Sequence, residues 1–232
     1  MAEPVSNYAI SPWKSRLDYP KVLAYEDLVE IFYDQTLGWQ LGIADLMMTG
    51  GAFSDGRRAG PRWEHAGFAA TTVCLSYFEL VGMILANKTE GDAFRWGVRE
   101  VSNKHLSEPA ADRLFTSGRC GFYHAGRARR AVRVRELEDG GFPIQYDPSA
   151  EIITVDAFRL PRALIQHLDG LRVRLLEVGP GKAPGEWFKD WMSREFDVKQ
   201  KASTTLELTG PEVIGSGQSV TSAKVVRRSG ES

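Results

Sequence analysis

The chain has 232 residues, of which 43% are hydrophobic and 25% charged, and its formal net charge is −1. This length suits one domain of ordinary size with terminal extensions, or at most two small domains, and the composition is that of a globular protein with a substantial core. The near-neutral charge excludes polyanion binding through overall charge, so any nucleic-acid binding must depend on a local cluster.

The N-terminal half predicts an irregular segment followed by three helices. Residues 1–22 hold three prolines and few apolar anchors. The first helix is predicted over 25–48, where apolar residues recur on one face at Leu28, Phe32, Trp39, Ile43 and Leu46. A glycine-rich loop (49–61) separates it from a second helix over 63–87, which is apolar nearly all round and therefore central. A shorter third helix is predicted over 92–105.

The pattern changes after the third helix. Ser107 is placed to cap a fourth helix, with Pro109 at or near its first position. Residues 131–137 then alternate apolar and charged, and two further apolar stretches flank the turn sequence DPSA. We therefore predict two or three short strands, forming a small β hairpin at about 131–156 on a helical body.

The C-terminal part predicts two more helices and a tail. GPGKAPG (179–185) contains two prolines and follows no strand, so we interpret it as a linker and not as a phosphate loop. Residues 186–196 form a short helix with one apolar side, which must pack on the body or on a partner. A long amphipathic helix precedes the linker, with the stripe Leu160, Leu164, Leu168, Leu171 and Leu175.

These elements predict a mostly α protein with four parts. Residues 1–22 form the irregular segment, 23–178 the helical domain, 179–198 the linker and short helix, and 199–232 a mobile tail of small and polar residues.

Three features of the sequence bear on its location. The two cysteines, Cys74 and Cys120, form no spaced disulfide framework, which indicates a reducing compartment. The N-terminus lacks the charged-then-apolar pattern of a signal peptide. Residues 66–86 approach the length of a membrane span but include Glu79 and polar residues, which favours a buried core helix. We predict a cytoplasmic protein without a membrane segment.

The main functional signal is the stretch RCGFYHAGRARR (119–130). No acidic residue lies between Asp112 and Glu136. The arginine fork suits bidentate contact with phosphate oxygens, whereas a solvated basic face that pairs with nearby acids is the alternative that charge alone leaves open. The interval holds seven arginines: Arg113, Arg119, Arg127, Arg129, Arg130, Arg133 and Arg135.

Arg119 and His124 suggest a chemistry for this stretch. Histidine can accept a proton near neutral pH, and a neighbouring arginine can stabilise charge on a phosphoryl centre, so the two could cleave RNA without a metal. In a straight helix they would lie about 140° apart. Gly118 and Gly121 could bend the chain to bring them together, or two copies of the segment could meet. Cys120 and His124 share a helical face but are too few for a metal site, so no cofactor is predicted.

The segment RCGFYH (119–124) resembles the arginine-x4–6-histidine signature of the HEPN superfamily, whose members are small helical bundles. It is similar to the RCGLFH type of segment in uncharacterised bacterial HEPN-like proteins. The order of predicted helices resembles the family layout over about residues 25–178. The resemblance implies a homodimer whose paired motifs face each other across a cleft. Many members are metal-independent endoribonucleases, often toxins or defence effectors, and others only bind.

On this resemblance the motif residues are Arg119 and His124. The position after the arginine is commonly Asn, Asp or His in the family but is a cysteine here, which hydrogen-bonds weakly. Some members add an acidic or Glu-x3-Lys element; the third helix has that spacing, and the central helix has a lone acid. The candidate supporting residues are Cys120, Glu79, Glu100 and Lys104.

We therefore predict a HEPN-like helical bundle with a small β hairpin and a C-terminal helix, acting as an RNA-directed endoribonuclease. The expected partners are RNA, a second copy that buries the region around 105–126, and a further protein such as an antitoxin. The alternatives are a non-catalytic dimeric RNA-binding or scaffold protein, and a structural subunit whose arginines only make ion pairs. The remaining histidines, His65, His105 and His167, are expected to be surface or packing residues.

Overall fold

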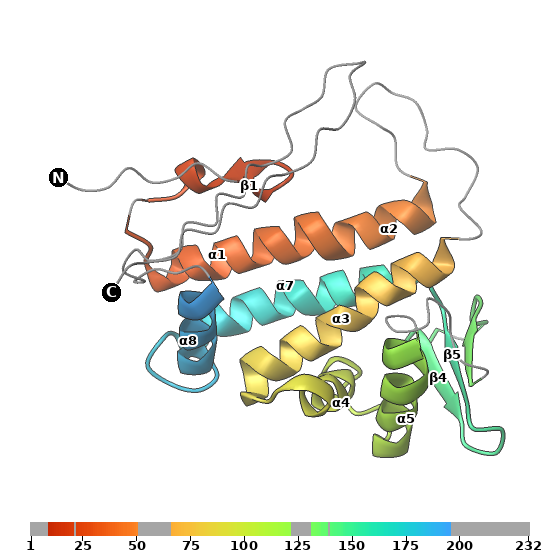
Figure 1. Cartoon of the computed structure of the whole chain (residues 1–232). Helices are drawn as coiled ribbons and strands as arrows, with labels where there is room; N and C mark the ends of the chain where they lie inside the picture. The colour runs from red at the N-terminus through yellow and green to blue at the C-terminus, as the bar shows by residue number, and fades with distance from the viewer. Residues whose placement is uncertain (1–8, 21, 51–65, 122–130, 139, 196–232) are drawn as a thin grey trace, which may run out of the picture. The chain divides into compact units, whose positions relative to one another are not determined.

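A computed structural model of the chain describes residues 9–20, 22–50, 66–121, 131–138 and 140–195. The chain divides by its contacts into two units, 1–199 and 200–232, and every described residue belongs to the first. The described part is mostly helical with two small sheets, which confirms the predicted mostly α class (Figure 1). Most of the predicted glycine-rich loop and the predicted tail lie outside the described residues.

The elements pass from a short hairpin through a run of helices to a small sheet and two final helices. In chain order they are β1 (Ala9–Ser11), β2 (Lys14–Ser15), η1 (Arg16–Asp18), α1 (Tyr25–Gln35), η2 (Thr36–Leu41), α2 (Gly42–Thr49), α3 (Gly67–Ala86), α4 (Glu90–Val101), α5 (Glu108–Arg113), η3 (Leu114–Arg119), β3 (Val132–Val134), β4 (Ile144–Asp147), β5 (Ile152–Val155), α7 (Leu160–Val178) and α8 (Gly185–Glu195).

The N-terminal segment is not irregular throughout, as the sequence predicted. β1 and β2 pair antiparallel, and η1 follows them. Ile10 of β1 is fully buried, and the ammonium of Lys14 lies 2.6 Å from the carboxylate of Asp34 on α1. Two hydrogen bonds add to these contacts, from the Tyr19 hydroxyl to Asp34 and from the Trp39 indole to the carbonyl of Ile10. These contacts hold the segment on the first long helix but leave no periodic signal in the sequence.

The first long helix spans α1, η2 and α2, close to the predicted range, but its middle part η2 is a π-helix. The prediction that Trp39 and Leu46 share the buried face of Leu28 and Phe32 is wrong, because they are 51% and 54% exposed. A π-helix bonds each residue to the fifth along, so it holds more residues per turn and shifts the apolar face. Beyond the start of η2 the buried apolar positions are Leu41, Ala44 and Met48.

α3 is the central helix, as predicted, and it contacts α2, α4, α7 and α8. It is long and apolar enough to cross a membrane by length and composition alone. α4 approaches it so closely that glycine is required on both helices. A Cβ atom at Gly82 would lie 2.0 Å from the carbonyl oxygen of Ala93, and one at Gly97 would lie 1.8 Å from that of Phe78.

α4 ends earlier than predicted, at Val101, and not at residue 105. Asn103 and Lys104 adopt left-handed backbone conformations, with φ of 49° and 63°, and these turn the chain out of the helix. α5 begins as predicted, because the Ser107 hydroxyl accepts a backbone N–H of the first turn and Pro109 lies within that turn.

The three-stranded sheet has the order β3–β5–β4. β4 and β5 form the predicted hairpin, whose turn is stabilised because Asp147 accepts hydrogen bonds from the amides of Ser149 and Ala150 at 2.9 and 3.1 Å. β3 pairs with β5 in parallel, which the sequence did not predict. One face of the sheet is buried against the helical body through Val132, Ile144, Ile153 and Val155.

The last two helices close the core. All five leucines of the predicted α7 stripe are buried, which confirms that helix. α8 packs on the chain's own body: the ring of Phe188 is fully buried and lies edge-on to Tyr25 and Phe32, with centroids 5.8 and 5.5 Å away. The Tyr25 hydroxyl donates to the carbonyl of Leu175 at 3.0 Å, which joins α1 to α7.

Candidate functional site

The motif arginine lies at the end of a π-helix that packs on the central helix. η3 continues α5 without a break, and its contacts with α3 bring Gly118 close to Leu75. A Cβ at Gly118 would lie 3.1 Å from a methyl group of Leu114 and 3.5 Å from one of Leu75, so a small residue suits this crossing. Arg119, the next residue, reaches back to α3.

Arg119 pairs with Glu79 on α3. Its Nε and Nη2 groups donate to the same carboxylate oxygen at 3.2 and 2.9 Å, and each side chain is 23% exposed. Charge-assisted bonds of this kind are short and directional, so Glu79 holds the arginine in one orientation.

Glu79 is therefore the candidate acid that the structure brings to the motif. Glu100 instead binds Arg174 of α7 at 2.9 Å, and Lys104 lies exposed in the turn after α4. The Glu-x3-Lys spacing on the third helix does not reach Arg119.

The cysteines are free thiols in different environments. Cys74 is fully buried, and burial raises the pKa of its thiol well above the ordinary value. Cys120 is half-buried at the end of η3, beside Arg119 in sequence. Among the residues that the structure describes, no group of three metal-ligating side chains comes together.

Half of the predicted motif lies beyond what the structure describes. Residues 122–130, which include His124 and the predicted RNA-binding Arg127, Arg129 and Arg130, are outside the described residues, and so is His65. The geometry of the Arg119–His124 pair, and the bend proposed at Gly121, therefore stay predictions.

The other predicted RNA-binding arginines differ in their partners. Arg113 of α5 forms an ion pair with Glu151, in the turn between β4 and β5, which ties the motif helix to the sheet. Arg133 of β3 and Arg135, directly after that strand, are exposed and make no ion pair or side-chain hydrogen bond with any described residue.

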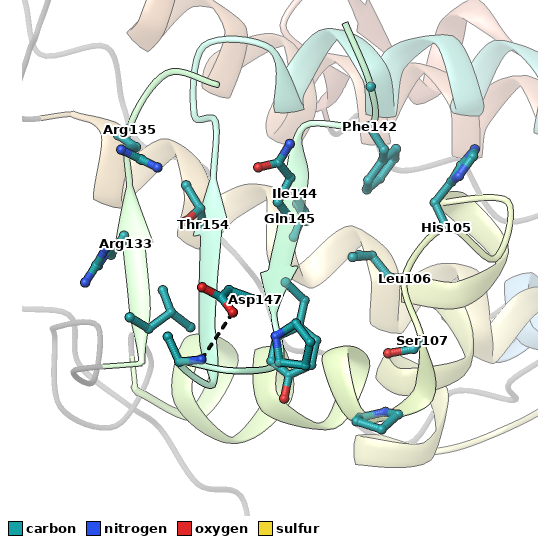
Figure 2. Close-up of a pocket in the computed structure, with 16 residues that line it drawn as sticks. His105, Leu106, Ser107, Arg133, Arg135, Phe142, Ile144, Gln145, Asp147 and Thr154 are labelled. Carbon is teal, nitrogen blue, oxygen red and sulfur yellow. Dashed lines mark hydrogen bonds between the residues drawn. The ribbon is translucent and has the colours of Figure 1, made fainter. Parts of the chain in front are cut away.

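Arg133 and Arg135 line a groove of about 850 Å³ on the outer side of the sheet (Figure 2). The α4–α5 connection forms its other wall and contributes His105. Phe142 and Gln145 also line the groove, although sequence reasoning gave them no role. The alternation of residues 131–137 indicated that side chains would point outward, but only the fold shows which elements they face.

His167 is a packing residue, as predicted. It lies between α7 and α3, where its Nδ1 is 2.8 Å from the hydroxyl of Tyr77. Burial lowers the pKa of His167 below its ordinary value and raises that of Tyr77. His105, also expected at the surface or in packing, is exposed at the groove.

Comparison of the chain with protein-family models, with curated proteins and with solved structures finds no match. A function must therefore be argued from the motif, the Arg119–Glu79 pair and the groove.

Proposed function

We propose that the protein is a HEPN-like, RNA-directed endoribonuclease that needs no metal ion, with Arg119 and His124 as its catalytic residues. The observation that carries the proposal is the Glu79–Arg119 ion pair. A guanidinium held by two hydrogen bonds is preorganised, and preorganised cations stabilise developing negative charge without reorganising during the reaction.

The proposed chemistry assigns one role to each motif residue. His124 removes the proton from a ribose 2′-hydroxyl, whose oxygen then attacks the adjacent phosphorus atom. Arg119 stabilises the negative charge that builds on the phosphorane. The bond to the 5′-oxygen of the next nucleotide breaks, that oxygen takes up a proton, and the upstream product ends in a 2′,3′-cyclic phosphate.

We extend the proposal to a homodimer. A twofold pairing of the motif segments would supply Arg119 from one copy and His124 from the other if the two do not meet within one chain. Light scattering at high micromolar concentration tests this part, because a clean monomer would contradict it. A cytoplasmic location, a toxin or defence role and a further partner such as an antitoxin belong to the same proposal.

The experiment that tests the proposed activity is RNA cleavage in EDTA. Wild-type protein is expected to cleave RNA, to leave DNA of the same sequence intact and to release 2′,3′-cyclic phosphate ends. His124→Ala is expected to lose at least about a hundredfold in rate, since general acid–base catalysis contributes roughly 10²–10⁴. Cleavage that persists equally in this variant would identify a contaminating nuclease, and absence of wild-type cleavage on every RNA tried would contradict the activity.

A second candidate function is RNA binding without cleavage. Two observations favour it: Glu79 already balances the charge of Arg119, and Cys120 occupies a position where family members commonly carry a better hydrogen-bonding side chain. RNA binding that persists in His124→Ala while no variant or wild-type preparation cleaves RNA would select this function.

A further inference from the structure

The groove beside β3 crosses the whole three-stranded sheet. Arg133, Thr154 and Gln145 are direct cross-strand partners in the order β3–β5–β4, and all three line the groove. Because cross-strand partners point to the same face, they form one polar row on the outer side of the sheet. The neighbouring pair Ile152–Asp147 also lines the groove, beside this row.

One side of the groove carries the positive charges of Arg133 and Arg135, which form no ion pair with any described residue. Arg133 lies in β3, and Arg135 follows the strand and continues along β5, because its backbone N–H donates to the carbonyl of Val155. In extended chain two residues apart, their Cα atoms lie roughly 6.6 Å apart, twice the rise per strand residue. This spacing is comparable with that of successive phosphates along an extended strand. Most other described arginines, such as Arg119 and Arg172, bind a carboxylate. Among the described residues that line the groove, the only carboxylate is that of Asp147, which accepts hydrogen bonds from the turn amides of Ser149 and Ala150.

The opposite side of the groove is aromatic. Phe142 is half-buried and packs partly on the core, and His105 faces the groove from the α4–α5 connection. Tyr146 also lines the groove, but it is the cross-strand partner of Ile153 and therefore points to the buried face of the sheet. The planar side chains of Phe142 and His105 offer faces on which unpaired bases can stack.

The groove continues past its aromatic side into a second hollow of about 520 Å³. His105, Gly141 and Phe142 line both hollows, and the second extends to Arg159 and Arg162 at the start of α7. A path that runs from β3 over the sheet to α7 suits an extended polymer better than a single small molecule.

We infer that this groove binds a single-stranded segment of the RNA, with its phosphates on Arg133 and Arg135 and its bases against Phe142 and His105. The inference rests on the proposed function for the choice of RNA and deepens it by naming the form of substrate. A duplex hides its base faces and offers nothing to the aromatic side. The inference also requires His105 to stay accessible, which restricts the dimer contact to the segment after it.

Binding can be measured independently of cleavage, with an uncleavable probe. The contacts involve phosphates and base faces, so a fluorescein-labelled oligo(dT) of about 12 nucleotides, within the range of known single-strand sites, should bind although it has no 2′-hydroxyl. Fluorescence anisotropy over roughly 50 to 200 mM salt gives the dissociation constant and its salt dependence.

The decisive comparison is between two double variants that lose the same charge. Arg133→Ala/Arg135→Ala is expected to weaken binding about tenfold and to reduce the slope of log K against log salt by about 1.4, because each phosphate contact on a single strand contributes about 0.7. Arg99→Ala/Arg194→Ala removes two exposed arginines of α4 and α8, outside the groove, and is expected to leave both quantities near wild type. Phe142→Leu should weaken binding several-fold at an unchanged slope.

Equal slopes and affinities in the two double variants would overturn the inference, as would a duplex competitor that displaces the probe as well as a single strand does. These outcomes are separate from the fate of the proposed activity. If wild-type protein binds the probe through the groove but cleaves no RNA, RNA binding by the groove is supported and the proposed ribonuclease activity is wrong. If the groove variant cleaves RNA with unchanged concentration dependence, the ribonuclease activity is supported and RNA binding by the groove is wrong.

Discussion

The motif arginine and the groove arginines differ in what already binds them. Arg119 is mostly buried against α3 and donates two hydrogen bonds to Glu79, whereas Arg133 in β3 and Arg135 directly after it are exposed without a described carboxylate partner. An arginine in an ion pair has a fixed side-chain orientation, but the carboxylate cancels most of its charge. An exposed arginine without a carboxylate partner attracts anions more strongly, but its side chain has no fixed orientation. We therefore assign orientation and rate to the first region and recruitment of the RNA strand to the second.

The largest effect is expected from disturbing the packing of α3 on α4, because these helices position both Arg119 and one wall of the groove. α3 carries Glu79, and α4 leads into the connection that forms one groove wall. Gly97→Ala would place a Cβ against the backbone carbonyl of Phe78, so we expect a loss of about 3 kcal/mol in the free energy of unfolding, measured by urea denaturation. Gly170→Ala in α7 is the control. Its Cβ would meet open space, and we expect a gain of about 0.5–1 kcal/mol. Equal effects of the two would contradict the close α3–α4 packing.

The second-largest effect is expected from removing the Glu79–Arg119 ion pair, which leaves the groove unchanged. Glu79→Gln keeps the size of the side chain but removes the ion pair, and we expect a loss of about 1–2 kcal/mol in stability, between the values for surface and buried pairs. RNA cleavage should fall at least about tenfold, while binding of the oligo(dT) probe stays unchanged. Glu100→Gln, which removes the partner of Arg174 and not that of Arg119, is the matched control. Equal cleavage in the two variants would show that Glu79 does not orient a catalytic arginine.

His167 and Tyr77 form a buried titratable pair outside the motif and the groove, and the titration of His167 adds its own pH dependence to the stability of the protein. Burial and the Arg174 charge lower the pKa of His167, against the opposing effect of Glu100. The unfolded chain binds a proton at this histidine near its ordinary pKa of about 6.5, and the folded chain does so only at lower pH. Stability from this group is therefore present above about pH 6.5 and is lost as the pH falls toward the folded pKa.

Urea unfolding at a series of pH values checks this expectation. Wild-type protein should lose stability below pH 6.5 more steeply than His167→Gln, which remains neutral and keeps a hydrogen-bonding group near Tyr77. Parallel curves for the two proteins would show that His167 does not contribute. Because this loss affects folding, it must be subtracted before a pH–rate profile is assigned to His124.

The smallest expected effect concerns the stability of the groove. Because Arg133 and Arg135 are exposed and have no described ion-pair partner, replacing both with alanine should change the free energy of unfolding by no more than about 0.5 kcal/mol. A larger loss, measured by urea denaturation, would mean that these arginines hold the sheet together, and the contrast with Arg119 would disappear.

The sequence predicted local features well and relations between distant segments poorly. The α7 leucine stripe and the Ser107 cap follow from spacing and residue type, and the structure confirms both. The burial of Trp39 was predicted wrongly, because a π-helix shifts the face and simple periodicity assumes regular turns. The choice of Glu79 over Glu100 as the partner of Arg119 needed the packing of η3 on α3, which no spacing along the chain encodes.

The groove was predictable only in part. The alternation in residues 131–137 placed Arg133 and Arg135 on one face of a strand; the structure has a shorter strand, Val132–Val134, which Arg135 directly follows. Their meeting with Phe142 and His105 depends on the parallel pairing of β3 with β5 and on the early end of α4 at Val101. Both are tertiary outcomes that local propensity does not determine.

The division between rate and recruitment is tested most directly by single-turnover cleavage of one single-stranded RNA, measured in EDTA as a function of protein concentration. We expect Arg119→Ala to lower the maximal rate by roughly 10²–10³, the range for loss of one group that stabilises transition-state charge, with the half-saturating concentration unchanged. Arg133→Ala/Arg135→Ala should raise the half-saturating concentration about tenfold and leave the maximal rate unchanged, since weaker phosphate contacts reduce binding alone. The reverse pattern, or the same change in both variants, would show that Arg119 does not set the rate separately from RNA binding by Arg133 and Arg135.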